Sequence, residues 1–280
     1  MLVLARKVGY IWESFFMDKN LSWANQIAVV TGGSGDIGAE VVRALLALGV
    51  KVASADLLPF PEVKSLRNST NFFPSIVDVS NSKEVDQWID TVTERWGTPT
   101  IAVIGATIVR NSTLVETSDA DWDAVISVGL SSSFYVARAV IKKMLLVQAH
   151  GKIVFIGSWA ASNPHPHIGS YSVMKAGTRA LMQNLALQYA QCGILINEVA
   201  PGIVDAGLSK ALFDKDPSLK ARALESIPLN LTLSTKDVAR DILFLCSPEN
   251  LVTTGIVLTS DGGLSITSTL NTGLPNRKIN

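Results

Sequence analysis

The chain has 280 residues with 24 basic and 24 acidic side chains, so its formal net charge at pH 7 is zero, and no basic run suggests a nucleic-acid partner. Hydrophobic residues make up 48% of the sequence, a share that buried parallel strands explain because such strands are unbroken apolar runs. Cys192 and Cys246 lie far apart without metal-ligand or disulfide spacing, which predicts inert packing residues, no bound metal and a reduced, cytoplasmic protein.

The first 23 residues are an N-terminal extension ahead of the first predicted strand. The apolar side chains within residues 8–15 have helical spacing and would form one apolar face. Charged residues interrupt this segment, which is too short to cross a bilayer, and no small-residue cleavage site follows, so we expect neither a transmembrane span nor a secretory signal. Two interpretations stay open: a helix that contacts a membrane surface or a partner, and upstream sequence ahead of a start at Met17.

Short β-branched runs alternate with helical patterns along the rest of the chain. The predicted strands are 26–33, 50–56, 71–80, 100–107, 152–157, 194–202 and 255–263. The predicted helices are 39–49, 82–96, 118–146, 170–191 and 234–246. This alternation predicts an α/β, doubly wound, Rossmann-like fold with a parallel sheet of about seven strands and helices on both faces. No linker interrupts it, so we expect one domain over residues 24–267 and a loose tail over 268–280.

Candidate site residues follow the strand ends, where ligands bind in open α/β sheets. A glycine-rich turn, "VTGGSGDIGAE" over residues 30–40, joins the first strand to its helix, and such a turn lets a backbone approach a phosphate at a helix N-terminus. Asp56 ends the second strand, where a carboxylate can accept hydrogen bonds from ribose hydroxyls and repel a 2′-phosphate. No Arg or Lys occupies the glycine turn, so NAD is favoured over NADP; a turn or capping role for Asp56 is the alternative.

Further segments match a known pattern. Residues 78 and 79 lie at the end of the third strand, 201–204 at the end of the sixth and 261–263 at the end of the seventh. With the glycine turn, they resemble the motifs of the short-chain dehydrogenase/reductase family over about residues 24–263, although Asp36 replaces the middle glycine of the family's turn. The resemblance implies cofactor contacts from Gly32, Ser34, Asp36, Ile37, Gly38, Asp56, Asp78, Val79, Ala106, Tyr171, Lys175, Pro201, Gly202, Ile203 and Val204.

Ser158, Tyr171 and Lys175 have the spacing of this family's catalytic residues. Tyr171 and Lys175 are one helical turn apart. A nearby ammonium, with the positive charge of the nicotinamide, stabilises phenolate, so we expect the tyrosine pKa to fall below its ordinary value of about 10. The resemblance implies that Tyr171 is the general acid or base, that Ser158 binds the substrate oxygen, and that Lys175 also holds the nicotinamide ribose. The implied reaction is hydride transfer between NAD(P) and a small-molecule secondary alcohol or ketone.

Trp159, His165 and His167 lie between Ser158 and Tyr171 and are substrate-pocket candidates. The two histidines either orient a polar substrate or relay protons, or they belong to a proline-stiffened surface loop. The resemblance also implies a homodimer or homotetramer that pairs through two long helices, here the apolar segments 134–147 and 180–190.

Several positions depart from the family pattern. Gly129 replaces a helix asparagine that holds a water beside the lysine, Ala206 replaces a threonine after the Pro-Gly loop, and residues 104–107 replace an Asn-Asn-Ala-Gly segment. The lost asparagine keeps open a non-redox epimerase, lyase or cyclase with bound nicotinamide, and an inactive nucleotide-binding scaffold is a further alternative. Because glycine is a poor helix former, Gly129→Asn is expected to raise the stability by roughly 0.5 kcal/mol.

Overall fold

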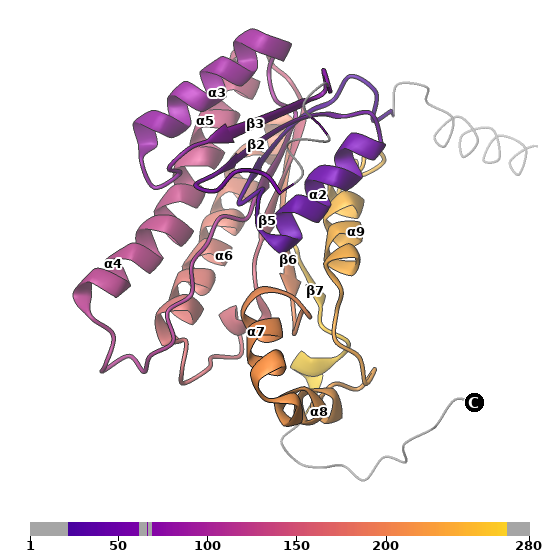
Figure 1. Cartoon of the computed structure of the whole chain (residues 1–280). Coiled ribbons are helices and arrows are strands. Elements are labelled where there is room, and N and C mark those ends of the chain that lie inside the picture. Colours follow the sequence, from indigo (N-terminus) through magenta and orange to yellow (C-terminus); the bar gives the residue numbers. More distant parts are fainter. Residues whose placement is uncertain (1–21, 62–65, 67–68, 268–280) are drawn as a thin grey trace, which may run out of the picture.

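The computed structural model describes residues 22–61, 66 and 69–267 (Figure 1). Of the N-terminal extension, only Ser22 and Trp23 fall within these ranges, and Trp23 packs against the core. The amphipathic segment ahead of them and the tail 268–280 lie outside the described residues.

A parallel sheet of seven strands forms the centre of the molecule. Its strands are β1 (Ile27–Thr31), β2 (Lys51–Asp56), β3 (Phe72–Ile76), β4 (Ile101–Ile104), β5 (Gly151–Ile156), β6 (Ile194–Pro201) and β7 (Val257–Ser260). Their order is β3-β2-β1-β4-β5-β6-β7, and every pair is parallel. The predicted doubly wound fold is therefore confirmed, and the strand order reverses between β1 and β4, where a ligand crevice is expected.

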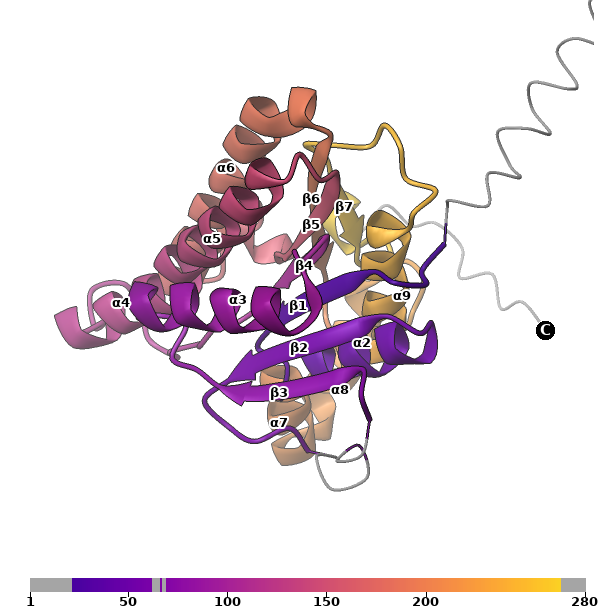
Figure 2. The ribbon, with the colours of Figure 1, turned by 90° about the horizontal axis from the view of Figure 1, so that it is seen from above.

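Two layers of helices cover the sheet (Figure 2). One layer holds α2 (Asp36–Ala47) and α9 (Thr235–Cys246); the other holds α3 (Ser82–Trp96), α5 (Ser132–Leu146) and α6 (Gly169–Tyr189). The strands between them are buried on both faces: in β1, Ile27 and Val29 face the α3, α5 and α6 layer, whereas Ala28 and Val30 face α2 and α9. This double burial is why the strands read as unbroken apolar runs.

The helix predicted over 118–146 is interrupted. Ser118 caps α4 (Asp119–Ile126), and a π-helical turn (Ser127–Ser131) joins α4 to α5. Gly129 is buried in this turn, where a Cβ would lie 2.4 Å from the sulfur of Met174 on α6. The stretch Asp119–Leu146 is long and apolar enough to cross a membrane by length and composition alone, but half of its most apolar window is buried inside the protein, as in a core helix.

Two helices that the sequence did not reveal, α7 (Gly207–Lys215) and α8 (Pro217–Ser226), lie below the carboxyl ends of the strands in Figure 1.

The structure corrects the prediction that both cysteines are packing residues. Cys192 is exposed at the end of a short 3-10 turn and is not a packing residue, whereas Cys246 is buried on α9. Burial raises the pKa of the Cys246 thiol to about 12, so it stays protonated and inert.

Candidate active site

A cavity of about 1020 Å³ opens at the carboxyl ends of the strands, as the strand order predicts. The glycine turn and Asp56 line one end of it, and the turn after β5 and the start of α6 line the other. The predicted site residues that line this cavity are Gly32, Ser34, Asp36, Ile37, Gly38, Asp56, Ser158, Trp159, His165, His167, Tyr171, Lys175, Pro201, Gly202, Ile203 and Val204.

The glycine turn leaves no room for a side chain at Gly32 or Gly38. Gly32 has a φ of 68°, and a Cβ there would lie 3.0 Å from the backbone of Ala106. At Gly38, a Cβ would lie 2.0 Å from the carbonyl oxygen of Gly32. This close packing keeps the backbone N–H groups at the start of α2 open to the cavity, which fits the pyrophosphate of a dinucleotide.

Asp56 braces the glycine turn from the end of β2. Its Oδ2 accepts the backbone N–H of Ser34 at 3.0 Å, and its Oδ1 accepts that of Leu58 at 3.1 Å. A carboxylate has about four acceptor positions, so two remain for the hydroxyls of a ribose. The turn role and the ribose-binding role of Asp56 are therefore compatible.

Asp36 reaches across the cavity. Its Oδ2 accepts the N–H of Gly207, the first residue of α7, at 2.8 Å. Ala206 offers no side chain to cap α7, so the carboxylate of Asp36 takes that place. It thus lies between the N-termini of α2 and α7, whose partial positive charges would otherwise face an anion in the cavity.

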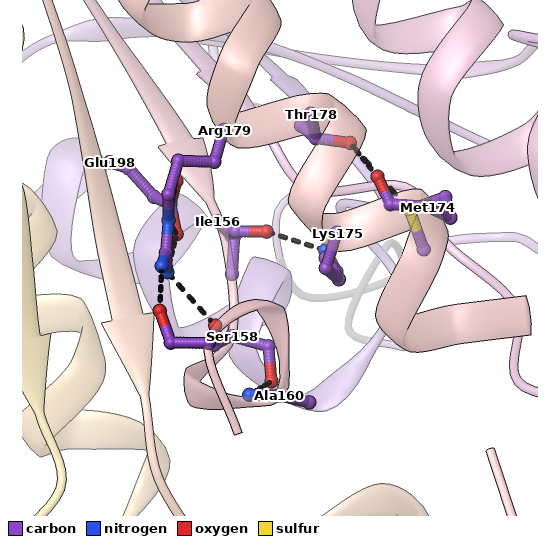
Figure 3. Close-up of polar contacts among 9 residues, drawn as sticks. Ile156, Ser158, Ala160, Met174, Lys175, Thr178, Arg179 and Glu198 are labelled. Atoms are coloured by element: carbon purple, nitrogen blue, oxygen red, sulfur yellow. Dashed lines mark hydrogen bonds and ion pairs between the residues drawn. The ribbon is translucent and has the colours of Figure 1, made fainter. Parts of the chain in front are cut away.

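Ser158, Tyr171 and Lys175 all line the cavity. Figure 3 shows Ser158 on the turn after β5 and Lys175 on α6. The Nζ of Lys175 donates to the carbonyl oxygen of Ile156 at 2.6 Å and lies 5.6 Å from the centre of the Tyr171 ring. Ser158 is the N-cap of a 3-10 turn (Trp159–Ala161) and its Oγ accepts the N–H of Ala160.

The protein groups alone do not lower the pKa of Tyr171, so the expected fall requires the positive charge of the nicotinamide as well. Burial raises that pKa above its ordinary value, and a hydrogen bond with Ser158 opposes the rise only in part. Burial also lowers the pKa of Lys175 to about 8. Burial therefore shifts the pKa of both groups more than their closeness to each other does.

Trp159, His165 and His167 line the cavity, which favours the pocket interpretation over a surface loop. The rings of Trp159 and His165 meet edge to face, with centroids 4.6 Å apart. Burial lowers the pKa of His165, so it is neutral at pH 7 and can donate or accept one hydrogen bond at each nitrogen.

Asp78, Val79 and Ala106 are not among the cavity's lining residues in the described chain. Asp78 instead accepts hydrogen bonds from the backbone and hydroxyl of Ser80 in the turn before α3. Several lining residues carry no motif, among them Val109, Asn111, Ser209, Leu212, Phe213 and Leu219; the sequence predicts only that the variable segment of about 205–228 sets the substrate. Four of these come from α7 and α8, a segment without a recognisable pattern.

Fold and cavity together define a dinucleotide-binding α/β enzyme. A family model described as enoyl-(acyl carrier protein) reductase matches residues 33–265. The 3-oxoacyl-[acyl-carrier-protein] reductase of Escherichia coli is 29% identical over 245 residues, covering 87% of this chain and 99% of that protein. The corresponding reductase of Thermotoga maritima is 30% identical and covers 86% and 98%, respectively. The crystal structure of gox2181 superposes with a TM-score of 0.82 at 29% identity, covering 88% of this chain and 98% of that one.

The chain belongs to the short-chain dehydrogenase/reductase family. It is a nicotinamide-dependent oxidoreductase that acts on ketone and alcohol groups. The non-redox and inactive alternatives are not favoured.

Proposed function

We propose that the chain reduces a neutral, largely apolar ketone, or oxidises the matching alcohol, with NAD as preferred cofactor. The observation that carries this proposal is the cavity itself, with Asp56 and the glycine turn at one end and Ser158, Tyr171 and Lys175 at the other. We also propose a cytoplasmic location, because Cys192 and Cys246 are both free thiols.

Bound nicotinamide supplies or accepts the hydride. Tyr171 then delivers a proton to the substrate oxygen during reduction, or removes it during oxidation. Ser158 donates a hydrogen bond to the same oxygen and stabilises the charge that develops there. Lys175, with a pKa of about 8, is mostly cationic at pH 7, so its charge favours the tyrosinate once that forms.

The preference for NAD rests on the charges around the cavity. Asp56 is an anion where a 2′-phosphate would lie, and Lys175 is the only lysine or arginine among the described residues that line the cavity. The extra phosphate of NADP would therefore lie beside an anionic side chain, with no cationic side chain there, among the residues that the structure describes, to bind it.

The proposed substrate follows from the residues that line the cavity near Ser158 and Tyr171. Val109, Ile168, Leu212 and Phe213 make this part of the cavity apolar, and the nearby His165 is neutral at pH 7. A carboxylate or phosphate on the substrate would find no basic side chain there except Lys175. The names of the reductases compared above describe reduction of 3-oxoacyl groups, so 3-oxoacyl thioesters are the first ketones to test.

Tyr171→Phe tests the mechanism because it removes only the proton donor. We expect turnover of a 3-oxoacyl thioester with NADH to fall about 100-fold or more, while the NADH dissociation constant measured by fluorescence stays close to that of the parent. Near-normal turnover in this variant would show that another group handles the proton.

The same fluorescence titrations test the cofactor preference. The parent should bind NADH more tightly than NADPH, and Asp56→Ala should narrow that difference, chiefly by weakening NADH. Tighter NADPH binding by the parent would contradict the preference.

A further inference from the structure

An ion pair that the proposed mechanism does not use lies beside the turn that carries Ser158. Arg179 follows Lys175 by one turn on α6, and its Nη2 lies 2.8 Å from Oε1 of Glu198 on β6 (Figure 3). Its Nε also donates to Oε2 at 3.1 Å. The Glu198 side chain is completely buried, and that of Arg179 is 17% exposed. A charge buried to this extent requires a partner of opposite charge, and here two nitrogens of the guanidinium contact both oxygens of the carboxylate.

Arg179 also holds the turn that carries Ser158. Its Nη2 donates to the carbonyl oxygen of Ser158 at 3.1 Å, and its Nη1 donates to Oγ of Ser162 at 2.5 Å. One guanidinium therefore connects α6, β6 and the turn after β5. A lysine could not make these contacts together, because it lacks the planar fork of donors.

Glu198 is fitted closely against the same turn. A Cβ at Gly157, the residue before Ser158, would lie 2.0 Å from Oε1 of Glu198. The negative charge of Glu198 raises the pKa of both Tyr171 and Lys175, which opposes the effect of burial at the lysine. The carboxylate is thus electrostatically coupled to both proton-handling residues.

Among the described residues, the remaining elements around Glu198 bring no competing charge. The turn after β5 contributes the hydroxyls of Ser158 and Ser162, and β7 contains no titratable side chain. On β5, Lys152 interacts with Cys246 on the α9 side instead. Within the part of the chain that the structure describes, the charged and titratable groups that act on Glu198 are therefore Tyr171, Lys175 and Arg179, all from α6.

We propose that Arg179 and Glu198 are positioning residues for the reaction: Arg179 fixes the backbone of Ser158, and Glu198 fixes the guanidinium of Arg179 for that contact. This inference rests on the proposed function of Ser158, Tyr171 and Lys175. Folding alone does not require such a pair, because well-packed apolar residues replace buried ion pairs without loss in many proteins.

The role of Glu198 is tested by Glu198→Gln, which removes the charge that holds the guanidinium of Arg179. We expect kcat for a 3-oxoacyl thioester with NADH to fall about tenfold, with little change in the NADH dissociation constant, because only the placement of Ser158 is altered. Lys143→Met is the control: it breaks the 2.6 Å ion pair with Asp90 between α5 and α3 and should leave kcat unchanged. A parent-like kcat in Glu198→Gln would overturn this role.

Glu198→Gln leaves Arg179 without its partner, and this variant can fail to fold. The double variant Arg179→Met/Glu198→Leu removes both buried charges and keeps side-chain volume, so it is expected to fold. Its kcat should also lie below that of the parent, because the carbonyl of Ser158 has lost its donor, and a parent-like kcat would again overturn the role.

The role of Arg179 is tested by Arg179→Lys, which keeps the charge and loses the fork. We expect kcat for a 3-oxoacyl thioester with NADH to fall about tenfold or more, with little change in the NADH dissociation constant. A parent-like kcat would overturn this role. Tyr171→Phe separates a failure of the proposed function from a failure of this inference. If that variant stays active, the proposed function fails. If it is inactive while Arg179→Lys and Glu198→Gln behave like the parent, only this inference fails.

Discussion

Lys175 shows how strongly burial acts on a single residue. Its side chain is 4% exposed, and one hydrogen bond to the carbonyl of Ile156 is its only described partner within hydrogen-bonding distance. Its pKa of about 8 lies well below the ordinary value of about 10.4. The folded chain therefore binds this proton less tightly than the unfolded chain does.

The consequence is a pH-dependent stability. Between about pH 8 and pH 10.5 the unfolded chain holds more protons at Lys175, so the free energy of unfolding should rise with pH across this window, by about 3 kcal/mol from this group. Lys175→Met should lack that rise. Urea unfolding of parent and variant at pH 7 and pH 10 measures the difference, and parallel behaviour of the two would contradict it.

At the scale of elements, Asp36 links α2 to α7 through its hydrogen bond with Gly207. Its negative charge also lies where the pyrophosphate of a dinucleotide is expected, so it should weaken cofactor binding. Asp36→Asn removes the charge and keeps an acceptor for Gly207, whereas Asp36→Ala removes both.

We expect both variants to bind NADH several-fold more tightly, because the repulsion is gone. Only Asp36→Ala should speed amide hydrogen exchange in α7, because only that variant loses the cap. If neither variant bound NADH more tightly, the carboxylate would not oppose the cofactor.

Gly129 in the π-helical turn is a second test at this scale. Helix propensity alone predicts a gain from Gly129→Asn, but the space beside Gly129 is filled by Met174. We therefore expect the variant to lose about 1–3 kcal/mol of stability through overpacking. The paired variant Gly129→Asn/Met174→Ala should recover part of the loss. Urea unfolding measures both, and a stability gain in the single variant would show that Met174 moves aside freely.

At the scale of the whole molecule, apolar side chains are exposed on the helical layer formed by α3, α5 and α6. Phe134 and Leu146 on α5 are 41% and 78% exposed, and Leu187 on α6 is 82% exposed. Arg138, one turn from Phe134, stacks over its ring with the guanidinium carbon 5.0 Å from the centroid. Exposed apolar side chains on both helices favour an interface with a second copy of the chain.

We therefore expect a dimer or tetramer by light scattering at micromolar concentration, and Leu187→Glu should shift the population toward monomer. Leu48→Glu is the matched control, because Leu48 is 40% exposed at the end of α2 in the opposite layer. A strictly monomeric parent would contradict the expectation.

The sequence by itself determined the strands, the parallel sheet, the glycine turn and the positions of Ser158, Tyr171 and Lys175. These features depend on local patterns: apolar runs for buried strands, and a spacing of four residues that brings Tyr171 and Lys175 to one side of a helix. Helix α9 was predicted for the same reason, since its capping box lies within four consecutive residues, from Ser234 to Asp237.

Only the tertiary structure decided the contacts between distant parts of the chain. Asp36 meets Gly207 across 171 positions, Met174 fills the space beside Gly129, and Arg179 joins Glu198 to the Ser158 turn. Side-chain packing sets these contacts, and no local pattern records them. The protonation behaviour of Tyr171 and Lys175 is decided in the same way, because burial depends on every element that covers a group, and here it outweighs the neighbour that the sequence places one turn away.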